Sequence, residues 1–214
     1  MIPVLGAQLP RRGNAFSRGL GRLMLWLMGW RIEGAFPDLP KMVLIGAPHT
    51  SNMDGVIGLA TLTALGLRAG TMIKDSAFKG VMGPILRWFG AIPINRRSPK
   101  GVVEQSVDAF AGNKRLVMLI APEGTRSSAP EWKRGFYHIA LGARVPVVPA
   151  AANYARKVIT IGPPLNPSGD YAADLQTLLA FYRDFGVPRH RNRLSKPLCE
   201  AQGIAWQSAR DADD

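Results

Sequence analysis

The chain has 214 residues and a mass of 23.2 kDa, with 47% hydrophobic and 20% charged residues, which excludes a disordered chain and suits one sizeable globular domain. Its 27 Lys and Arg residues outnumber 15 Asp and Glu residues, so the net charge is +12. This excess is concentrated in residues 1–100, with 13 basic and four acidic side chains, and favours an anionic partner such as nucleic acid, an acidic membrane surface or a phosphorylated substrate.

Residues 15–30 form the first predicted element, an amphipathic helix. Its apolar side chains recur at spacings of three and four, and Arg18 and Arg22 lie one turn apart on another face. Trp26 and Trp30 suit the headgroup level of a bilayer, and the arginines suit anionic lipid. We therefore expect an amphipathic, membrane-associating segment over the first 36 residues. The alternative is an ordinary amphipathic helix packed on its own domain.

After this helix, short apolar runs alternate with helical patterns. Strands are predicted at residues 42–47, 71–74, 91–95, 115–121, 145–151 and 157–161. Helices are predicted at residues 53–67, 77–89, 102–112, 135–142 and 171–185. The alternation predicts a single α/β domain over residues 37–186, with a largely parallel or mixed sheet covered by helices.

The longest stretch without a charged residue is the 13 residues between Asp54 and Arg68, whereas a membrane-spanning helix needs roughly 20 apolar residues. No span is therefore expected. Residues 187–214 read as a basic and then acidic C-terminal tail. The single cysteine, Cys199, excludes an internal disulfide, and the lack of a signal-peptide pattern favours a cytosol-facing location.

The first motif with chemical potential lies at residues 48–55, where a predicted strand ends and a helix begins. Histidine is a natural general base near neutral pH, which makes His49 a candidate, and Asp54 could fix its tautomer if a turn brings the two together. Ligands of open α/β sheets bind outside such strand ends. The alternative is structural, because Ser51 and Asp54 also fit a capping box.

Two further motifs follow predicted strands. Residues 121–126 carry Glu123, Gly124, Thr125 and Arg126, in which the glycine permits close approach of the backbone to a ligand and the arginine offers a planar fork for phosphate. A solvated turn is the alternative. The strand at residues 91–95 delivers two more arginines, Arg96 and Arg97, which could equally be solvent-facing charge.

In this order and spacing, the motifs resemble the glycerolipid acyltransferase family, which includes bacterial 1-acylglycerol-3-phosphate acyltransferases. The matching blocks are residues 49–54, 90–96, 123–126 and 145–149. The third block matches outright, whereas Pro93 and Asn95 depart from the residues that are common in the second. The resemblance covers roughly residues 40–152.

The resemblance implies an α/β acyltransferase fold and an O-acyltransferase. An acyl thioester, on coenzyme A or acyl carrier protein, would donate its chain to the hydroxyl of a lysophospholipid. The expected acceptor is 1-acylglycerol-3-phosphate, which would give phosphatidic acid. His49 would act as the base and Asp54 would orient it. No metal or other cofactor is implied.

Arg96 and Arg126 would hold the acceptor phosphate, while Glu123, Gly124 and Thr125 shape its pocket. Lys74 resembles a basic position between the first two blocks and is a further candidate for a phosphate or donor contact. One of the helices at residues 53–67 and 77–89 is expected to line an apolar groove for the acyl chain. The resulting expectation is a peripheral or monotopic enzyme on the cytoplasmic face of the inner membrane, bound to an anionic surface.

Three other functions remain open at this stage. One is acylation of a different lyso-lipid, such as lyso-ornithine lipid. Another is a basic nucleic-acid-binding domain, although the sequence has no recognised nucleic-acid motif, so no nucleic-acid partner is expected. A nuclease or phosphatase that uses His49 is the third, although acids that could ligate two metals are scarce.

Overall fold

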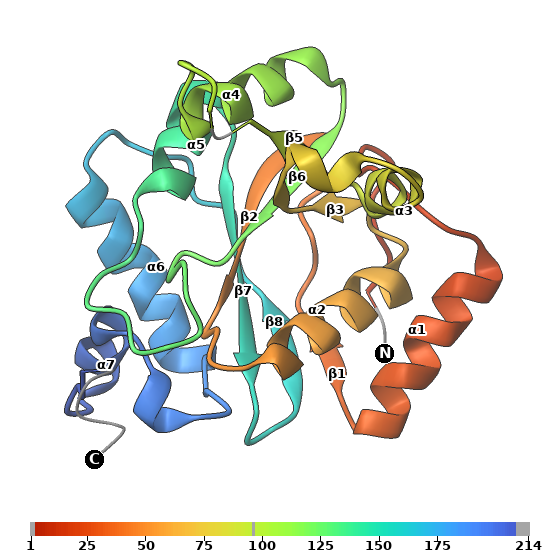
Figure 1. Ribbon diagram of the computed structural model, residues 1–214. Helices are drawn as coiled ribbons and strands as arrows, with labels where there is room; N and C mark the ends of the chain where they lie inside the picture. The colour runs from red at the N-terminus through yellow and green to blue at the C-terminus, as the bar shows by residue number, and fades with distance from the viewer. Residues whose placement is uncertain (1–2, 96, 209–214) are drawn as a thin grey trace.

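A six-stranded sheet forms the centre of the computed structural model, which describes residues 3–95 and 97–208 (Figure 1). Its strands are β1 (Arg31–Glu33), β2 (Lys41–Ala47), β3 (Ala69–Gly70), β6 (Leu116–Ile120), β7 (Val147–Asn153) and β8 (Val158–Ile161). Their order is β1-β8-β7-β2-β6-β3, and all neighbours are parallel except β7 and β8. The expected α/β fold with a largely parallel, mixed sheet is confirmed.

Helices cover both faces of this sheet. They are α1 (Ala15–Met28), α2 (Asn52–Leu65), α4 (Val102–Gly112), α5 (Gly135–Ala143), α6 (Tyr171–Phe185) and α7 (Lys196–Gln202). Successive side chains of a strand point to opposite faces, so a strand buried on both sides must be apolar throughout. In β2, Met42 and Leu44 pack with α1 and α2, whereas Val43 and Ile45 pack with α4, α5, α6 and α7.

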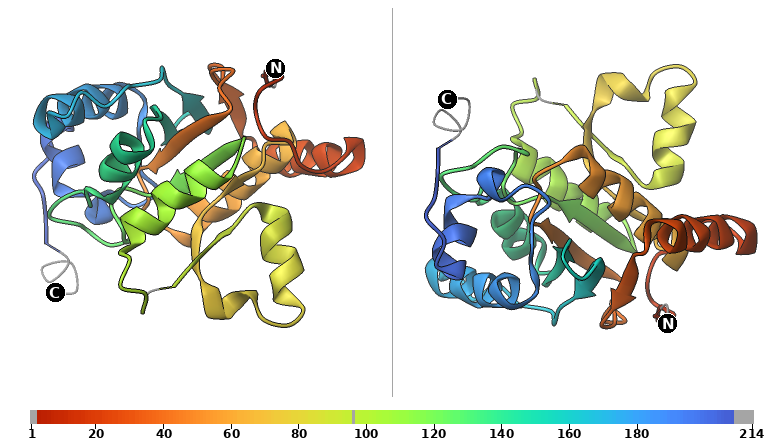
Figure 2. Two further views of the ribbon diagram at one scale, coloured as in Figure 1. Left: turned by 90° about the horizontal axis from the view of Figure 1, so that it is seen from above. Right: turned by 90° about the horizontal axis from the view of Figure 1, so that it is seen from below.

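Two predicted strands lie outside the central sheet. They are β4 (Met72–Lys74) and β5 (Ile92–Ile94), which form a separate parallel pair. The helix expected at residues 77–89 is wrong in its first part, because a 3₁₀ turn, η1 (Asp75–Phe78), precedes α3 (Met82–Phe89). Gly80 lies between them with φ of +60°, a left-handed conformation that an α-helix does not contain. The segment projects beside the central sheet (Figure 2), and the end of α3 contacts the body of the molecule, where the Arg68 guanidinium donates to the carbonyl of Arg87 over 3.1 Å.

The segment expected as a tail begins by packing on the domain. Val187 donates its backbone N–H to the carbonyl of Ala152 over 2.9 Å. After the 3₁₀ turn η2 (Arg191–Arg193), the side chains of Leu194 and Leu198 are buried in the same core as α6. Cys199 is buried with them, and this burial raises the pKa of its thiol. The described residues from 187 onward are therefore part of the domain.

Helix α1 is amphipathic, as expected, and packs against α2 (Figure 1). Gly21 allows this close approach, since a Cβ there would lie 2.4 Å from the backbone nitrogen of Ala64. Trp26 is 73% exposed, but the headgroup position expected for Trp30 is wrong, because that side chain is buried in the core.

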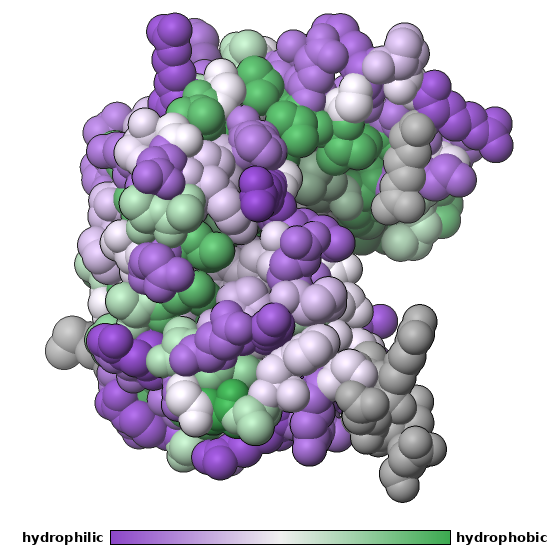
Figure 3. Space-filling model, turned by 90° about the vertical axis from the view of Figure 1, so that its left-hand side faces the viewer, coloured by the Kyte–Doolittle hydropathy of each residue, from purple (hydrophilic) through white to green (hydrophobic). Residues whose placement is uncertain are grey.

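No helix within residues 3–95 and 97–208 has both the length and the apolar character needed to cross a bilayer. Viewed from the side, the surface is hollowed by a deep notch, and hydrophobic side chains gather along its upper wall (Figure 3).

Candidate active site

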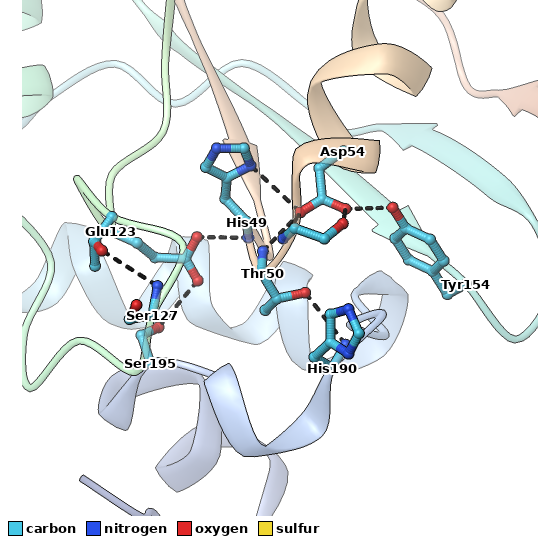
Figure 4. A network of polar contacts seen from close by, with 10 residues as sticks. His49, Thr50, Asp54, Glu123, Ser127, Tyr154, His190 and Ser195 are labelled. Atoms are coloured by element: carbon cyan, nitrogen blue, oxygen red, sulfur yellow. Dashed lines mark hydrogen bonds and ion pairs between the residues drawn. The ribbon is translucent and has the colours of Figure 1, made fainter. Parts of the chain in front are cut away.

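The carboxyl ends of three neighbouring parallel strands bring the candidate residues together. His49 follows β2, Glu123 follows β6 and Tyr154 follows β7. Because β2 pairs in parallel with both β6 and β7, these three residues lie together at the carboxyl ends of the strands. The residues gathered there come from segments far apart in the sequence (Figure 4).

His49 and Asp54 face each other across the turn that starts α2. The Nδ1 atom of His49 lies 3.4 Å from Oδ2 of Asp54. Ser51 is the N-cap of α2, and its backbone N–H donates to the same Oδ2 over 2.7 Å. Asp54 therefore completes the capping box and faces the imidazole at once, so its structural role does not exclude a contact with His49.

Tyr154 is the third member of this cluster, and sequence reasoning missed it. Its hydroxyl donates to Oδ1 of Asp54, and its ring packs edge-on against Trp30 with centroids 4.9 Å apart (Figure 4). Burial alone would raise the pKa of Asp54, but hydrogen bonds from His49, Tyr154 and the backbone of Ser51 and Thr50 outweigh it and lower that pKa to about 2. Asp54 is thus an anion throughout the physiological pH range.

Glu123 supports the backbone of the histidine. The N–H of His49 donates to Oε2 of Glu123 over 2.6 Å, and the Ser195 hydroxyl lies 3.3 Å from the other oxygen. Trp132 in turn donates to the Ser195 hydroxyl over 3.1 Å. The Glu123 side chain is only 2% exposed, so it lies beneath the site as a buried support, whereas a place in a phosphate pocket was expected.

Burial raises the pKa of Glu123 to about 7, against hydrogen bonds that favour the carboxylate. Between about pH 4.5 and 7 the folded chain keeps a proton that the unfolded chain has lost, so the stability contributed by this group falls as pH rises. We expect Glu123→Gln to lose less thermal stability than the wild type between pH 5 and 8. Differential scanning calorimetry of both proteins, with exposed Glu131→Gln as the control, checks this. Parallel pH profiles would contradict it.

The other candidate residues surround this cluster. Gly124 adopts φ of +67° in the turn after Glu123, and Thr125 and Arg126 are exposed on the same turn. Lys74 is exposed at the end of β4. Arg96 lies outside the described residues.

A cavity of about 510 Å³ begins at His49 and Asp54 and continues between α2 and the sheet. Its lining is mostly apolar. The sequence left open which of two helices lines the groove, and both α2 and α3 do so, α2 with Leu62 and α3 with Leu86. Gly58 of α2 lines the cavity, and a Cβ built there would meet no atom within 4 Å. The lack of a side chain at this position therefore leaves space in the cavity. An extended apolar ligand with a reactive end at His49 fits this shape.

Comparison with known proteins agrees with this arrangement. A family model described as Acyltransferase matches residues 33–153. Two curated relatives are both named 1-acyl-sn-glycerol-3-phosphate acyltransferase. The protein from Limnanthes alba is 29% identical over 147 residues, covering 65% of this chain and 51% of the relative. The protein from Cocos nucifera is 30% identical over 151 residues, covering 65% and 46%. The chain thus spans about half the length of these relatives.

A solved structure has the same fold. It is the 1-acyl-sn-glycerophosphate (LPA) acyltransferase PlsC from Thermotoga maritima, with a TM-score of 0.56 and 15% identity. The match covers 76% of this chain and 73% of that one. At this identity the likeness concerns the fold alone.

Proposed function

Because the chain belongs to the Acyltransferase family, we propose that it transfers an acyl chain from a thioester to the free hydroxyl of a lysophospholipid. The acceptor that the relatives' names favour is 1-acylglycerol-3-phosphate, and the product is then phosphatidic acid. The observation that carries the proposal is the His49–Asp54 pair at the mouth of an apolar cavity. A base at that position serves the hydroxyl, while the cavity takes the chain.

In the proposed reaction, the two ring nitrogens of His49 have different tasks. Nδ1 faces the Asp54 carboxylate, which leaves Nε2 to accept the proton of the acceptor hydroxyl. As the proton moves, the hydroxyl oxygen forms a C–O bond with the thioester carbonyl carbon. The C–S bond then breaks, and the imidazolium gives the proton to the departing thiolate, which leaves as the thiol. The anionic Asp54 stabilises the positive charge that His49 carries between these steps.

The direct test uses the purified chain, 1-acylglycerol-3-phosphate and acyl donors on coenzyme A or acyl carrier protein. Formation of phosphatidic acid, followed by mass spectrometry, is the expected result with at least one donor. Lyso-ornithine lipid belongs in the same acceptor panel as the alternative substrate. Failure to acylate any lyso-lipid in mixed micelles would contradict the proposal.

Arg126 is proposed to bind the acceptor phosphate from the exposed turn beside Glu123. We expect Arg126→Ala to raise the acceptor KM about tenfold and to leave the donor KM nearly unchanged, with Arg126→Lys restoring part of the loss because it keeps the charge but not the planar fork. Arg144→Ala, at the end of α5, is the matched control. Equal weakening with a phosphate-free acceptor would contradict this role.

Helix α1 is proposed to hold the enzyme on an anionic membrane surface, on the cytoplasmic face of the inner membrane, as a peripheral or monotopic protein. One face of the helix exposes large apolar side chains, with Phe16, Trp26 and Leu27 the most exposed. Arg18 and Arg22 lie on the same helix, where they can contact lipid phosphates. Support for this proposal comes from the lack of any acidic residue in α1.

Point substitutions test this surface better than truncation, because removing the N-terminal segment would also remove the buried side chains of Leu9 and Leu25. The double variant Trp26→Ser, Leu27→Ser is expected to bind anionic vesicles at least tenfold more weakly, since burying one such side chain is worth about 1.5–3 kcal/mol. Co-sedimentation at increasing salt measures this, with Leu141→Ser on α5 as the control. Unchanged sedimentation of the double variant would place the lipid contact elsewhere.

A further inference from the structure

Helix α3 carries apolar side chains that the domain does not cover. Val81, which precedes the helix, is 82% exposed, and Met82, Ile85 and Trp88 are exposed as well. At about 100° per residue, Val81, Ile85 and Trp88 fall within about 60° around the helix axis, and Met82 lies beside them. These four side chains form one apolar stripe, the α3 stripe, on a segment that projects beside the central sheet (Figure 2).

The α3 stripe is continuous with the wall of the cavity. Leu86 and Phe89 line the cavity and follow Met82 by four and seven residues, which places them on the same side of the helix as Met82. Leu59 of α2 lines the cavity too, and it is 43% exposed. One apolar face of α3 therefore meets the cavity along one side and solvent along the other.

Arg12 ties α3 to the body of the domain. The carbon of its guanidinium lies 4.8 Å from the ring centroid of Phe89 and 5.2 Å from that of Trp88, and Nη2 donates to the Thr63 hydroxyl of α2 over 3.1 Å. Helix α1 packs against α2 as well. Both helices that expose large apolar side chains, α1 and α3, are thus held to α2 by contacts within the domain.

The charge around α3 indicates which kind of partner covers the stripe. Residues 71–95 hold three basic side chains and one acidic side chain, and α3 itself contains no acid. The basic residues are Lys74, Lys79 and Arg87, and all three are exposed. Exposed apolar and basic residues without acids also characterise α1. Amphipathic helices of this composition lie in the headgroup region of anionic bilayers, where a tryptophan is favoured.

We propose that the α3 stripe is a second lipid-binding surface, separate from α1, which inserts among the headgroups of an anionic bilayer. Contact through both α1 and α3 fixes the orientation of the domain on the membrane, because two contact elements leave it less freedom to tilt than one. The same contact brings the cavity wall to the bilayer, so an acyl chain moves between lipid and cavity with little exposure to water. This last consequence rests on the proposed acyl transfer, whereas the lipid contact does not.

A fluorescent label at one position tests the contact directly. Ile85→Cys is labelled with an environment-sensitive fluorophore, while the native Cys199 is buried and shielded from the reagent. We expect the emission to shift to shorter wavelength when vesicles of phosphatidylcholine and phosphatidylglycerol are added. The same label at Leu141→Cys, a similarly exposed position on α5, is the matched control and should not shift. An unchanged spectrum at position 85 would overturn the inference.

The double variant Val81→Ser, Ile85→Ser tests the energetic contribution of the stripe while α1 stays intact. It is expected to bind the same vesicles about tenfold more weakly than the wild type. Its kcat/KM should fall by a similar factor for a lysophospholipid presented in vesicles. For a short-chain acceptor dissolved as monomers, kcat/KM should stay near the wild-type value, because neither residue lines the cavity. Leu141→Ser again serves as the control.

Wild-type vesicle binding by the folded double variant would overturn the inference and leave the proposed function in place. A loss of activity confined to donors on acyl carrier protein, with vesicle binding unchanged, would also count against it, because the stripe would then be a protein-binding surface. Weakened vesicle binding together with a wild type that acylates no lyso-lipid would support the lipid contact and count against the proposed function alone.

Discussion

Replacement of His49 by alanine is expected to lower kcat/KM for acyl transfer by about 10²–10⁴-fold, because the acceptor hydroxyl loses the base that takes its proton. The side chain of His49 is 28% exposed and faces the cavity mouth, so the substitution removes little packing. Steady-state kinetics, with circular dichroism and a melting curve to establish folding, measure the effect.

The matched control for this substitution is His138→Ala, on the exposed face of α5. It should leave kcat/KM near the wild-type value. Near-normal turnover by a folded His49→Ala protein would show that another group removes the hydroxyl proton, and the proposed mechanism would be wrong.

Replacement of Asp54 by asparagine is expected to lower kcat by about 10³–10⁴-fold, because a neutral amide neither holds the tautomer of His49 nor stabilises its positive charge. The variant also reports on stability. The pKa of Asp54 is about 2 in the folded chain against an ordinary 3.8, so the unfolded chain binds more protons between these values. The stability from this carboxylate, about 2 kcal/mol, is therefore present above about pH 4 and lost as pH falls toward 2.

Two measurements separate the roles of Asp54. The difference in free energy of unfolding between the wild type and Asp54→Asn should be larger at pH 7 than at pH 3, as measured by urea unfolding at each pH. The loss of kcat should persist at pH 7 under conditions in which the variant is fully folded. A folded variant with normal kcat would reduce Asp54 to a helix cap.

The sequence predicted the long elements of the fold well, because their patterns are local. The apolar run of β6 and the continuous strand β2 are buried on both faces, as their composition indicated. Strands β1 and β3 were missed, since three and two residues carry no periodicity. Helix α7 was also missed, because its segment is basic and interrupted by proline, although Pro197 sits in the first turn, where proline is tolerated.

The contacts in the candidate site also fall into two groups, those set by the local sequence and those set by the packing of distant segments. His49 and Asp54 could be paired from sequence, since only one turn separates them. The contacts of Tyr154 and Ser195 depend on how distant segments pack, and nothing in their local sequence indicates them. Glu123 was identified as a candidate site residue from the sequence. Its burial beneath His49 depends on how the loop after β6 and Ser195 pack, which the local sequence does not indicate.

The pairing of β1 with β8 has a consequence for the order of events during synthesis. Arg31 pairs with Val158, so the first strand has no place in the sheet until almost three quarters of the chain exists. Folds that depend on such distant contacts form slowly. Helix α1 leaves the ribosome long before then, with its apolar face available to lipid. If α1 binds the membrane as proposed, the nascent chain can reach the bilayer before Tyr154 has joined Asp54, and anchoring then precedes the assembly of a competent enzyme.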